Sequence, residues 1–385
     1  VEFDPPTNFR SAQISKYEVK NIQTAESVIV TESPAIFTGL VNGSKYTFSV
    51  SATNTLGTSN TAISNTVIPQ AVWKSSIIDK NADSKYLASG VYAGKPVIAY
   101  SDSKNGDLKL ATYSGSKWST TTVDGNQLSI GRTNNNVSGY VSMCTSVVGK
   151  TNYLHLFYAD LVDKDLRYAV YNGKYWLYEV VDGDGGAIQD YKEFPRVRGG
   201  SDVSVSNACA VTTDGVQVFY RDESQGILLG AVKDKNEWRY EIVDGDKDTQ
   251  ERTTGDVGFH LKATTVGKKI HLIYDSVRGF DLDRNVTRGD IRYASRGSAL
   301  VEDWVYKTLD VPAEGVAVAG YAVGIFNSKR GINFSWFTAS GISFPNPNQL
   351  RYKNLTDTVF TDVSSANYGK PNSPVSIDEK SILFS

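Results

Sequence analysis

The segment that decides the fold is LHLFYADLVDKDLRYAVYNGKYWLYEVVDG, residues Leu154–Gly183. An apolar run ends in Tyr158, and an acid lies just beyond it. A turn then leads to a second short run, and a further run begins at Trp176 and ends at Asp182. Short apolar runs separated by turn residues are typical of antiparallel strands. The segment therefore predicts consecutive strands of one antiparallel sheet.

The same pattern recurs along the chain. Five of the six tryptophans are followed by an aspartate six positions later, at Trp73/Asp79, Trp118/Asp124, Trp176/Asp182, Trp238/Asp244 and Trp304/Asp310. Runs that end in tyrosine precede four of these tryptophans, and short strands after a turn begin at Leu108, Leu166, Leu228, Ile291 and Leu350. With a weaker first strand, each unit has four strands, and the tryptophans lie 45 to 66 residues apart. This is the size of a propeller blade.

We therefore expect an all-β chain in which residues 73–385 form a β-propeller of about six four-stranded blades. The units end near residues 124, 182, 244, 310 and 363, and Trp336 stands in the tyrosine position of the fifth unit. The tyrosine-terminated runs are apolar on both faces, as strands between two neighbouring sheets must be. A strand at 73–79 should complete the last blade together with residues 374–385 and so close the ring.

Residues 1–69 are expected to form a small, separate β-sandwich. Its centre, GLVNGSKYTFSVSATNTLGTSN at Gly39–Asn60, resembles the second half of a fibronectin type III domain. The matching positions are Leu40, Asn42, Gly43, Tyr46, Phe48, Val50, Ala52, Asn54 and Gly57. The resemblance implies that the Tyr46 hydroxyl forms a hydrogen bond with backbone upstream of it. The early strand that normally supplies a core tryptophan has no counterpart, so the sandwich should be short by one or two strands.

Composition removes two classes of partner. The formal net charge is −2, from 40 basic and 42 acidic residues, so no long-range field favours nucleic acid. No apolar run approaches the roughly 18 residues that cross a bilayer, so we expect no membrane insertion. Cys144 and Cys209 are expected to be buried thiols. His155 and His271 share one strand position, three before the tyrosine, which favours a role in the core.

The recurring acids are candidates for ligand contact. In an antiparallel blade, the loop between the second and third strands and the loop to the next blade leave at the same end. A ring of carboxylates and tyrosines there could bind sugar hydroxyls. The candidate residues are Tyr100, Asp102, Tyr158, Asp160, Tyr220, Asp222 and Asp275, with Arg278, Arg284 and Arg288 from a charged insertion at 276–290. The alternative is turn chemistry, in which each aspartate caps its own backbone.

No cofactor is expected, with calcium as the alternative. The runs DGDGG and DGDKD offer four candidate ligands, Asp182, Asp184, Asp244 and Asp246. Neither run has the spacing of an EF-hand loop.

The whole chain resembles secreted or surface-displayed proteins in which fibronectin modules precede a sialidase-like propeller that lacks catalytic residues. SDSKNGDLKLATY at Ser101–Tyr113 places its glycine and aromatic residue at other offsets than the sialidase Asp-box Ser-x-Asp-x-Gly-x-x-Trp. The resemblance implies a recognition or adhesion protein at an extracellular, cell or virion surface, phage decoration included. It would bind glycan or a surface protein, or assemble into a larger surface structure. The alternative is a glycoside hydrolase or lyase, which needs only a suitably spaced pair of carboxylates.

Overall fold

The computed structural model describes residues 1–7, 12–70, 76–125, 130–183, 201–246, 252–254, 256–280, 286–297, 304–311, 318–328, 331–339, 349–359, 361–364, 374–376 and 382–384. The chain divides into two compact units, Val1–Ile77 and Ile78–Ser385. The described residues form strands and turns, and they include no helix that could cross a membrane.

The first unit is built on one antiparallel sheet with the order β2-β1-β3-β4, in which β5 also pairs with β3. The strands are β1 (Lys16–Asn21), β2 (Ser27–Val30), β3 (Phe48–Asn54), β4 (Gly57–Thr58) and β5 (Ala62–Ile63). Alternate residues of β1 are buried, and Val19 packs with Tyr46 and Phe48 in the core. The Val41 N–H donates to the Tyr46 hydroxyl at 3.0 Å, so this tyrosine bonds to upstream backbone as expected.

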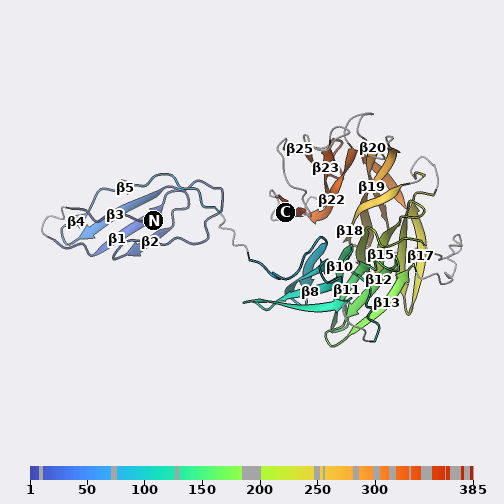
Figure 1. Ribbon diagram of the computed structural model, residues 1–385. Coiled ribbons are helices and arrows are strands. Elements are labelled where there is room, and N and C mark those ends of the chain that lie inside the picture. Colours follow the sequence, from blue (N-terminus) through green and yellow to red (C-terminus); the bar gives the residue numbers. More distant parts are fainter. Residues whose placement is uncertain are drawn as a thin grey trace. The chain divides into compact units, whose positions relative to one another are not determined.

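The second unit consists of antiparallel sheets whose strands follow in sequence order (Figure 1). The first blade contains β6 (Leu87–Tyr92), β7 (Lys95–Asp102), β8 (Asp107–Tyr113) and β9 (Trp118–Asp124). The second contains β10 (Val141–Val148), β11 (Thr151–Ala159), β12 (Leu166–Tyr171) and β13 (Trp176–Asp182). The third contains β14 (Asn207–Thr212), β15 (Gly215–Asp222), β16 (Ile227–Asp234) and β17 (Glu237–Asp244).

The fourth and fifth blades continue this meander. The fourth contains β18 (Val257–Val266), β19 (Lys269–Phe280), β20 (Val286–Arg296) and β21 (Val305–Asp310). The fifth contains β22 (Val318–Ser328), β23 (Gly331–Ala339), β24 (Gln349–Asn354) and β25 (Thr361–Ser364). The strands β26 (Pro374–Ser376) and β27 (Ile382–Phe384) pair with each other, and β26 lies beside β22.

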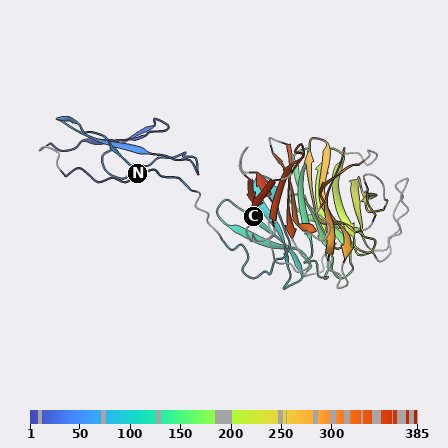
Figure 2. The ribbon, with the colours of Figure 1, turned by 90° about the horizontal axis from the view of Figure 1, so that it is seen from above.

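The second unit is a β-propeller, as the repeats predicted. The first strands of successive blades lie beside one another, and the sheets follow each other around a ring in sequence order (Figures 1 and 2). The cores lie between adjacent blades, because both faces of each second strand are covered. Phe157 of the second blade, for example, shares a buried cluster with Val218 and Trp238 of the third.

The repeated residues occupy equivalent positions. Trp118, Trp176 and Trp238 lie at the start of fourth strands, opposite Tyr113, Tyr171 and Lys233 of the third strands. All five four-stranded blades have a register shift between the third and fourth strands; it lies near the start of the third strand in four of them and within β20, at Ile291/Arg292, in the fourth blade. In the first three blades the bulged residue directly precedes the aspartate of the Asp-Gly turn.

Ring closure by residues 73–79 stays a prediction. Residues 71–75 lie outside the described residues, and the structure assigns no strand to Ser76–Asp79. The insertion in the fourth blade differs from the loop that we expected, because the ladder of β19 and β20 continues into it. Ser276 pairs with Asp290, and Val277 pairs with Gly289.

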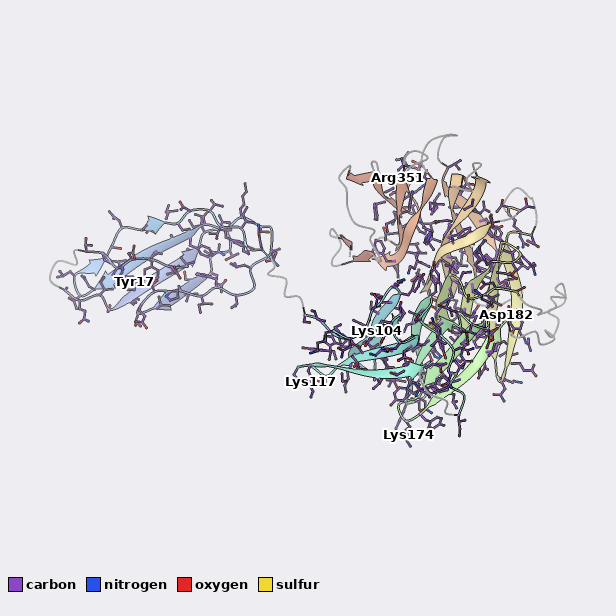
Figure 3. All side chains as sticks on the ribbon, in the orientation of Figure 1. Tyr17, Lys104, Lys117, Lys174, Asp182 and Arg351 are labelled. Carbon is purple, nitrogen blue, oxygen red and sulfur yellow. A yellow bond between two sulfur atoms is a disulfide. The ribbon has the colours of Figure 1, made fainter. Side chains whose placement is uncertain are left out.

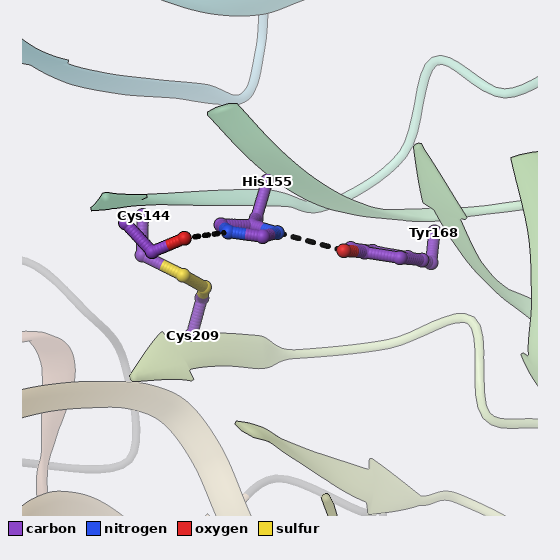
Figure 4. Close-up of a disulfide and its surroundings, with 5 residues drawn as sticks. Cys144, His155, Tyr168 and Cys209 are labelled. Carbon is purple, nitrogen blue, oxygen red and sulfur yellow. Dashed lines mark hydrogen bonds between the residues drawn. A yellow bond between two sulfur atoms is a disulfide. The ribbon is translucent and has the colours of Figure 1, made fainter. Parts of the chain in front are cut away.

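The expectation of two buried thiols is wrong. Cys144 of β10 and Cys209 of β14 form a disulfide between the first strands of the second and third blades (Figure 4). They are 65 residues apart in sequence, and their Cα atoms are 5.8 Å apart. The ring arrangement brings the two first strands together, which the sequence spacing does not reveal.

Candidate functional site

In each of the first four blades, the aspartate at the end of the fourth strand joins the blade to the next one. Asp124 is fully buried. Its Oδ1 accepts the backbone N–H groups of Gly125 at 2.9 Å and Thr133 at 2.8 Å. Its Oδ2 accepts the Tyr158 hydroxyl at 2.6 Å and the Arg167 Nε at 3.1 Å, both from the second blade. We call this arrangement the inter-blade clasp.

The clasp between the third and fourth blades has the same design. Asp244 accepts the backbone N–H groups of Gly245 and Thr253, each at 2.9 Å. It also accepts the Tyr274 hydroxyl at 2.7 Å and the Arg292 Nε at 2.9 Å. Two clasps with matching donors at matching positions show that the six-residue spacing from tryptophan to aspartate encodes a structural joint.

The remaining clasps vary in their donors. The Asp79 carboxylate accepts hydrogen bonds from the Tyr100 hydroxyl and the Lys109 Nζ. Asp182 accepts one from the Tyr220 hydroxyl. Asp310 accepts hydrogen bonds from the Trp336 Nε1 and the Arg351 Nη1. Trp336 thus takes the tyrosine role, as its position predicted. The hydrogen bond from Lys109 lowers the pKa of Asp79 to about 2. In the third blade, Leu229 stands where the other blades have Lys or Arg.

The predicted ligand tyrosines are therefore parts of the clasps. Tyr100, Tyr158 and Tyr220 are buried, and each donates its hydroxyl to an aspartate of the preceding segment. Burial, with the Asp124 carboxylate next to it, raises the pKa of Tyr158 well above its ordinary value. In this conformation these hydroxyls are not available to a ligand, because the protein already uses them.

Three acids of the second set, Asp102, Asp160 and Asp222, cap turns, as in the alternative interpretation. Asp102, Asp160, Asp222 and Asp275 are buried. Asp160 Oδ1 accepts the backbone N–H groups of Val162 at 3.0 Å and Asp163 at 3.2 Å. Asp102 accepts from Asp83 and Asn105, Asp222 from Gln225, and Asp275 contacts His260 at 2.8 Å. We therefore assign Asp102, Asp160 and Asp222 to the turns, and Asp275 of β19 to a contact with His260 of β18 inside the fourth blade.

The three predicted arginines of the insertion lie partly or wholly outside the described residues. Arg278 and Arg288 belong to β19 and β20, but their side chains are outside the described residues, as is the whole of Arg284. Their contact with a ligand stays a prediction.

Of the four calcium candidates, three have protein partners and one lies outside the described residues. Asp182 and Asp244 are held in clasps, Asp246 pairs with Arg252, and Asp184 lies outside the described residues. In the part of the chain that the structure describes, no group of three or more His, Cys, Asp or Glu residues could hold a metal ion.

The two histidines lie in the core, as expected. His155 Nδ1 is 2.7 Å from the Tyr168 hydroxyl, and His155 Nε2 is 2.8 Å from Ser146 Oγ (Figure 4). His271 Nδ1 is 2.7 Å from the Tyr293 hydroxyl in the same way. Burial lowers the pKa of each histidine to about 4.

A second joint lies nearer the start of the fourth strands. The Trp238 Nε1 of the third blade donates to Glu179 Oε2 of the second blade at 3.0 Å. Lys233, opposite Trp238, pairs with the same carboxylate, and its Nζ lies 5.1 Å from the centre of the indole ring. We call this set of tryptophan, glutamate and cation the outer triad. The outer triad thus places an ion pair and an indole ring between the second and third blades.

The next pair of blades has an equivalent outer triad. Trp304 Nε1 donates to Glu241 Oε2 at 3.0 Å, and Arg296 binds Glu241 Oε1 at 2.6 Å. The Arg296 guanidinium lies 4.8 Å from the centre of the Trp304 ring and also donates to Gln217.

The junction of the first and second blades lacks both the glutamate and the cation of the outer triad. Trp176 keeps the tryptophan position, but Tyr171 stands in place of the cation and Thr121 in place of the glutamate. The rings of Tyr171 and Trp176 stack at 5.0 Å, and those of Trp176 and Tyr178 at 6.4 Å. Tyr92 of the first blade lies 5.9 Å from Tyr171. We call Tyr92, Tyr171, Trp176 and Tyr178 the aromatic row.

The aromatic row is half-buried, and Thr121 is exposed. Lys117 and Lys174 lie at the outer ends of the adjacent hairpins (Figure 3). Among the described residues, the Trp176 indole nitrogen has no hydrogen-bond acceptor, in contrast to Trp238 and Trp304. Sequence reasoning missed this row, although one signal was present: the third residue after Trp118 is Thr121, where the next two blades have glutamate.

Comparisons with known proteins find similar solved structures but no matching family. No family model matches the chain, and no curated protein matches it. Among solved structures, it is similar to the six-bladed propeller lectin of Aleuria aurantia, with 13% identity and a TM-score of 0.43 over 82% of this chain and 89% of that one. It is also similar to the GH93 α-L-arabinofuranosidase of Fusarium graminearum, with 12% identity and a TM-score of 0.46 over 80% and 89%.

A third similar structure is an exo-1,5-α-L-arabinanase from a bovine ruminal metagenomic library. It has 10% identity and a TM-score of 0.39 over 74% of this chain and all of that one. These solved structures include a lectin and two glycosidases. At such identities and scores the likeness carries no argument about ligand or activity, so the function must be argued from the residues of this chain.

Proposed function

We propose that this chain is a recognition protein whose propeller binds glycan, and that it is not an enzyme. The observation that supports this proposal is the aromatic row between the first and second blades. Ligand sites are commonly lined by aromatic side chains with a few well-placed polar groups. Tyrosine and tryptophan combine a flat apolar face with a polar edge, and this suits the alternating C–H and hydroxyl groups of a sugar ring.

The hydrolase alternative would require a pair of carboxylates that reach the substrate. The two recurring sets of aspartates are poor candidates for that pair, because they are buried and already contact groups of their own blade or of the next blade. A buried carboxylate that is held by several donors is not free to protonate a leaving group or attack a sugar carbon. The recurring acids therefore favour binding over hydrolysis.

The first unit belongs to the proposal as a fibronectin type III-like spacer or anchor. The bond between the Val41 N–H and the Tyr46 hydroxyl supports this assignment. An extracellular, cell-surface or virion-surface location is also part of the proposal, with assembly into a larger surface structure. The disulfide between Cys144 and Cys209 supports it, since disulfides form and persist mainly in oxidising compartments.

A glycan array, run in parallel with a hydrolysis assay on the same glycans, tests the proposal. We expect binding to a restricted set of glycans without release of sugar. Turnover of an array ligand that disappears when one exposed carboxylate is replaced would overturn the binding role and favour the hydrolase.

A further inference from the structure

We infer that the surface between the first and second blades, at Thr121, Tyr171 and Trp176, is the glycan site, and that its ligand is an uncharged saccharide. This inference rests on the proposed function and locates it. It depends on a comparison within the molecule, because the same surface is occupied at the next two blade junctions.

The occupied junctions show what is missing at the first one. At the junction of the second and third blades, Glu179 accepts the Trp238 indole and pairs with Lys233, and Trp238 is only 9% exposed. At the first junction the tryptophan is retained, but a threonine and a tyrosine replace the ion pair. Trp176 is therefore more exposed than Trp238, and the place of the glutamate is taken by a shorter, exposed side chain.

Three unused polar groups lie at this junction. The Trp176 indole N–H, the Tyr171 hydroxyl and the Thr121 hydroxyl have no hydrogen-bond partner among the described residues. By contrast, the Tyr178 hydroxyl donates to the Val123 carbonyl at 2.8 Å and fixes the end of the row. A rigid platform with free donors and acceptors at its edge loses little entropy when it binds a ligand.

The chemistry of the junction selects the ligand class. Neither partner position carries a charge, so an ionised carboxylate on the ligand would lose water without gaining the cation that the other junctions provide. Sugar hydroxyls can both donate and accept, which matches an indole N–H beside two hydroxyl groups. Stacking on Tyr171 and Trp176 would cover the C–H face of a pyranose ring.

The decisive variant refills the junction. Thr121→Glu combined with Tyr171→Lys rebuilds the outer triad that Glu179 and Lys233 form one blade further on. We expect this double variant to lose at least tenfold in affinity while its melting temperature stays equal or rises. Ser116→Glu is the matched control, because it adds the same acid to an exposed turn of the same blade. It should leave affinity unchanged.

A second variant tests the indole donor. Trp176→Phe keeps an aromatic ring but removes the N–H, and we expect a loss of about fivefold, the effect of one neutral hydrogen bond. Trp118→Phe is the control, at the same strand position of the first blade. Binding would be measured by tryptophan fluorescence and calorimetry with the strongest neutral oligosaccharide of the array, beside its uronate or sialylated counterpart.

The outcomes separate the site from the function. If the native protein binds neutral glycan and the refilled variant binds it equally well, the site is wrong and the proposed function stands. If the native protein binds no glycan on the array, the proposed function fails and this inference fails with it. Stronger binding of the anionic counterpart would overturn the ligand class. If the refilled variant does not fold, the Trp176→Phe result decides.

Discussion

Replacing Asp124 by asparagine should weaken the propeller far more than its single-atom change implies. Four donors converge on this carboxylate, two from the backbone and two from the side chains of Tyr158 and Arg167. An asparagine offers one acceptor oxygen and an NH₂ group that can only donate. In either orientation the NH₂ group faces donors, and the Arg167 Nε cannot reverse its role.

The magnitude follows from burial. Asp124 is fully buried, and the Arg167 side chain is 11% exposed, so the variant leaves a cation without its counter-charge. Removing one partner of a buried ion pair costs about 3 to 5 kcal/mol. Tyr158→Phe retains the ion pair and loses one hydrogen bond to a charged group, which costs about 1.5 to 3 kcal/mol. At about 2 °C for each kcal/mol in a domain of this size, Asp124→Asn should lower the melting temperature by about 6 to 10 °C.

Tryptophan fluorescence suits the assay, because five of the six tryptophans belong to the propeller unit. The variants Asp124→Asn and Tyr158→Phe would be unfolded beside Asp214→Asn, which changes an exposed turn residue and should have no effect. A loss of less than 1 °C for Asp124→Asn, or a larger loss for Tyr158→Phe than for Asp124→Asn, would refute the clasp.

The other predictions concern the turns and the buried histidines. Asp160→Ala with Asp222→Ala should lower the melting temperature by several degrees and leave the affinity of the folded fraction unchanged, which thermal unfolding and titration on one sample can measure. Gly183→Ala should destabilise by more than about 2 kcal/mol in urea unfolding, since its φ is +115° and a Cβ would lie 2.3 Å from a neighbouring carboxylate oxygen. His155 and His271 have pKa values of about 4 in the folded protein and about 6.5 in the unfolded chain. The free energy of unfolding should therefore be highest above pH 6.5, where both states bind no proton at these residues. It should fall between pH 6.5 and 4, by up to about 3 kcal/mol for each histidine. Changing both to glutamine, the residue of the third blade, should flatten this dependence, and an unchanged pH profile would contradict it.

The sequence by itself determined the architecture, because a blade is specified locally. Strand periodicity, turn residues and the spacing from Trp176 to Asp182 depend on residues near one another in the chain, so they could be recognised without knowing the ring. The equivalence of Trp336 to the tyrosines and the core position of His155 were predictable for the same reason. The hydrogen bond from the Val41 N–H to the Tyr46 hydroxyl also joins residues only five positions apart.

Only the tertiary structure decided what the recurring groups do. Asp124 meets Tyr158 and Arg167 across 34 and 43 residues, and Cys144 meets Cys209 across 65, because consecutive blades lie face to face around the ring. A buried aspartate and one that awaits a ligand can have the same local sequence. The difference is whether the next blade supplies hydrogen-bond donors to the carboxylate. Those donors lie at a variable distance along the chain, so their contact with the aspartate cannot be recognised from a repeat in the sequence.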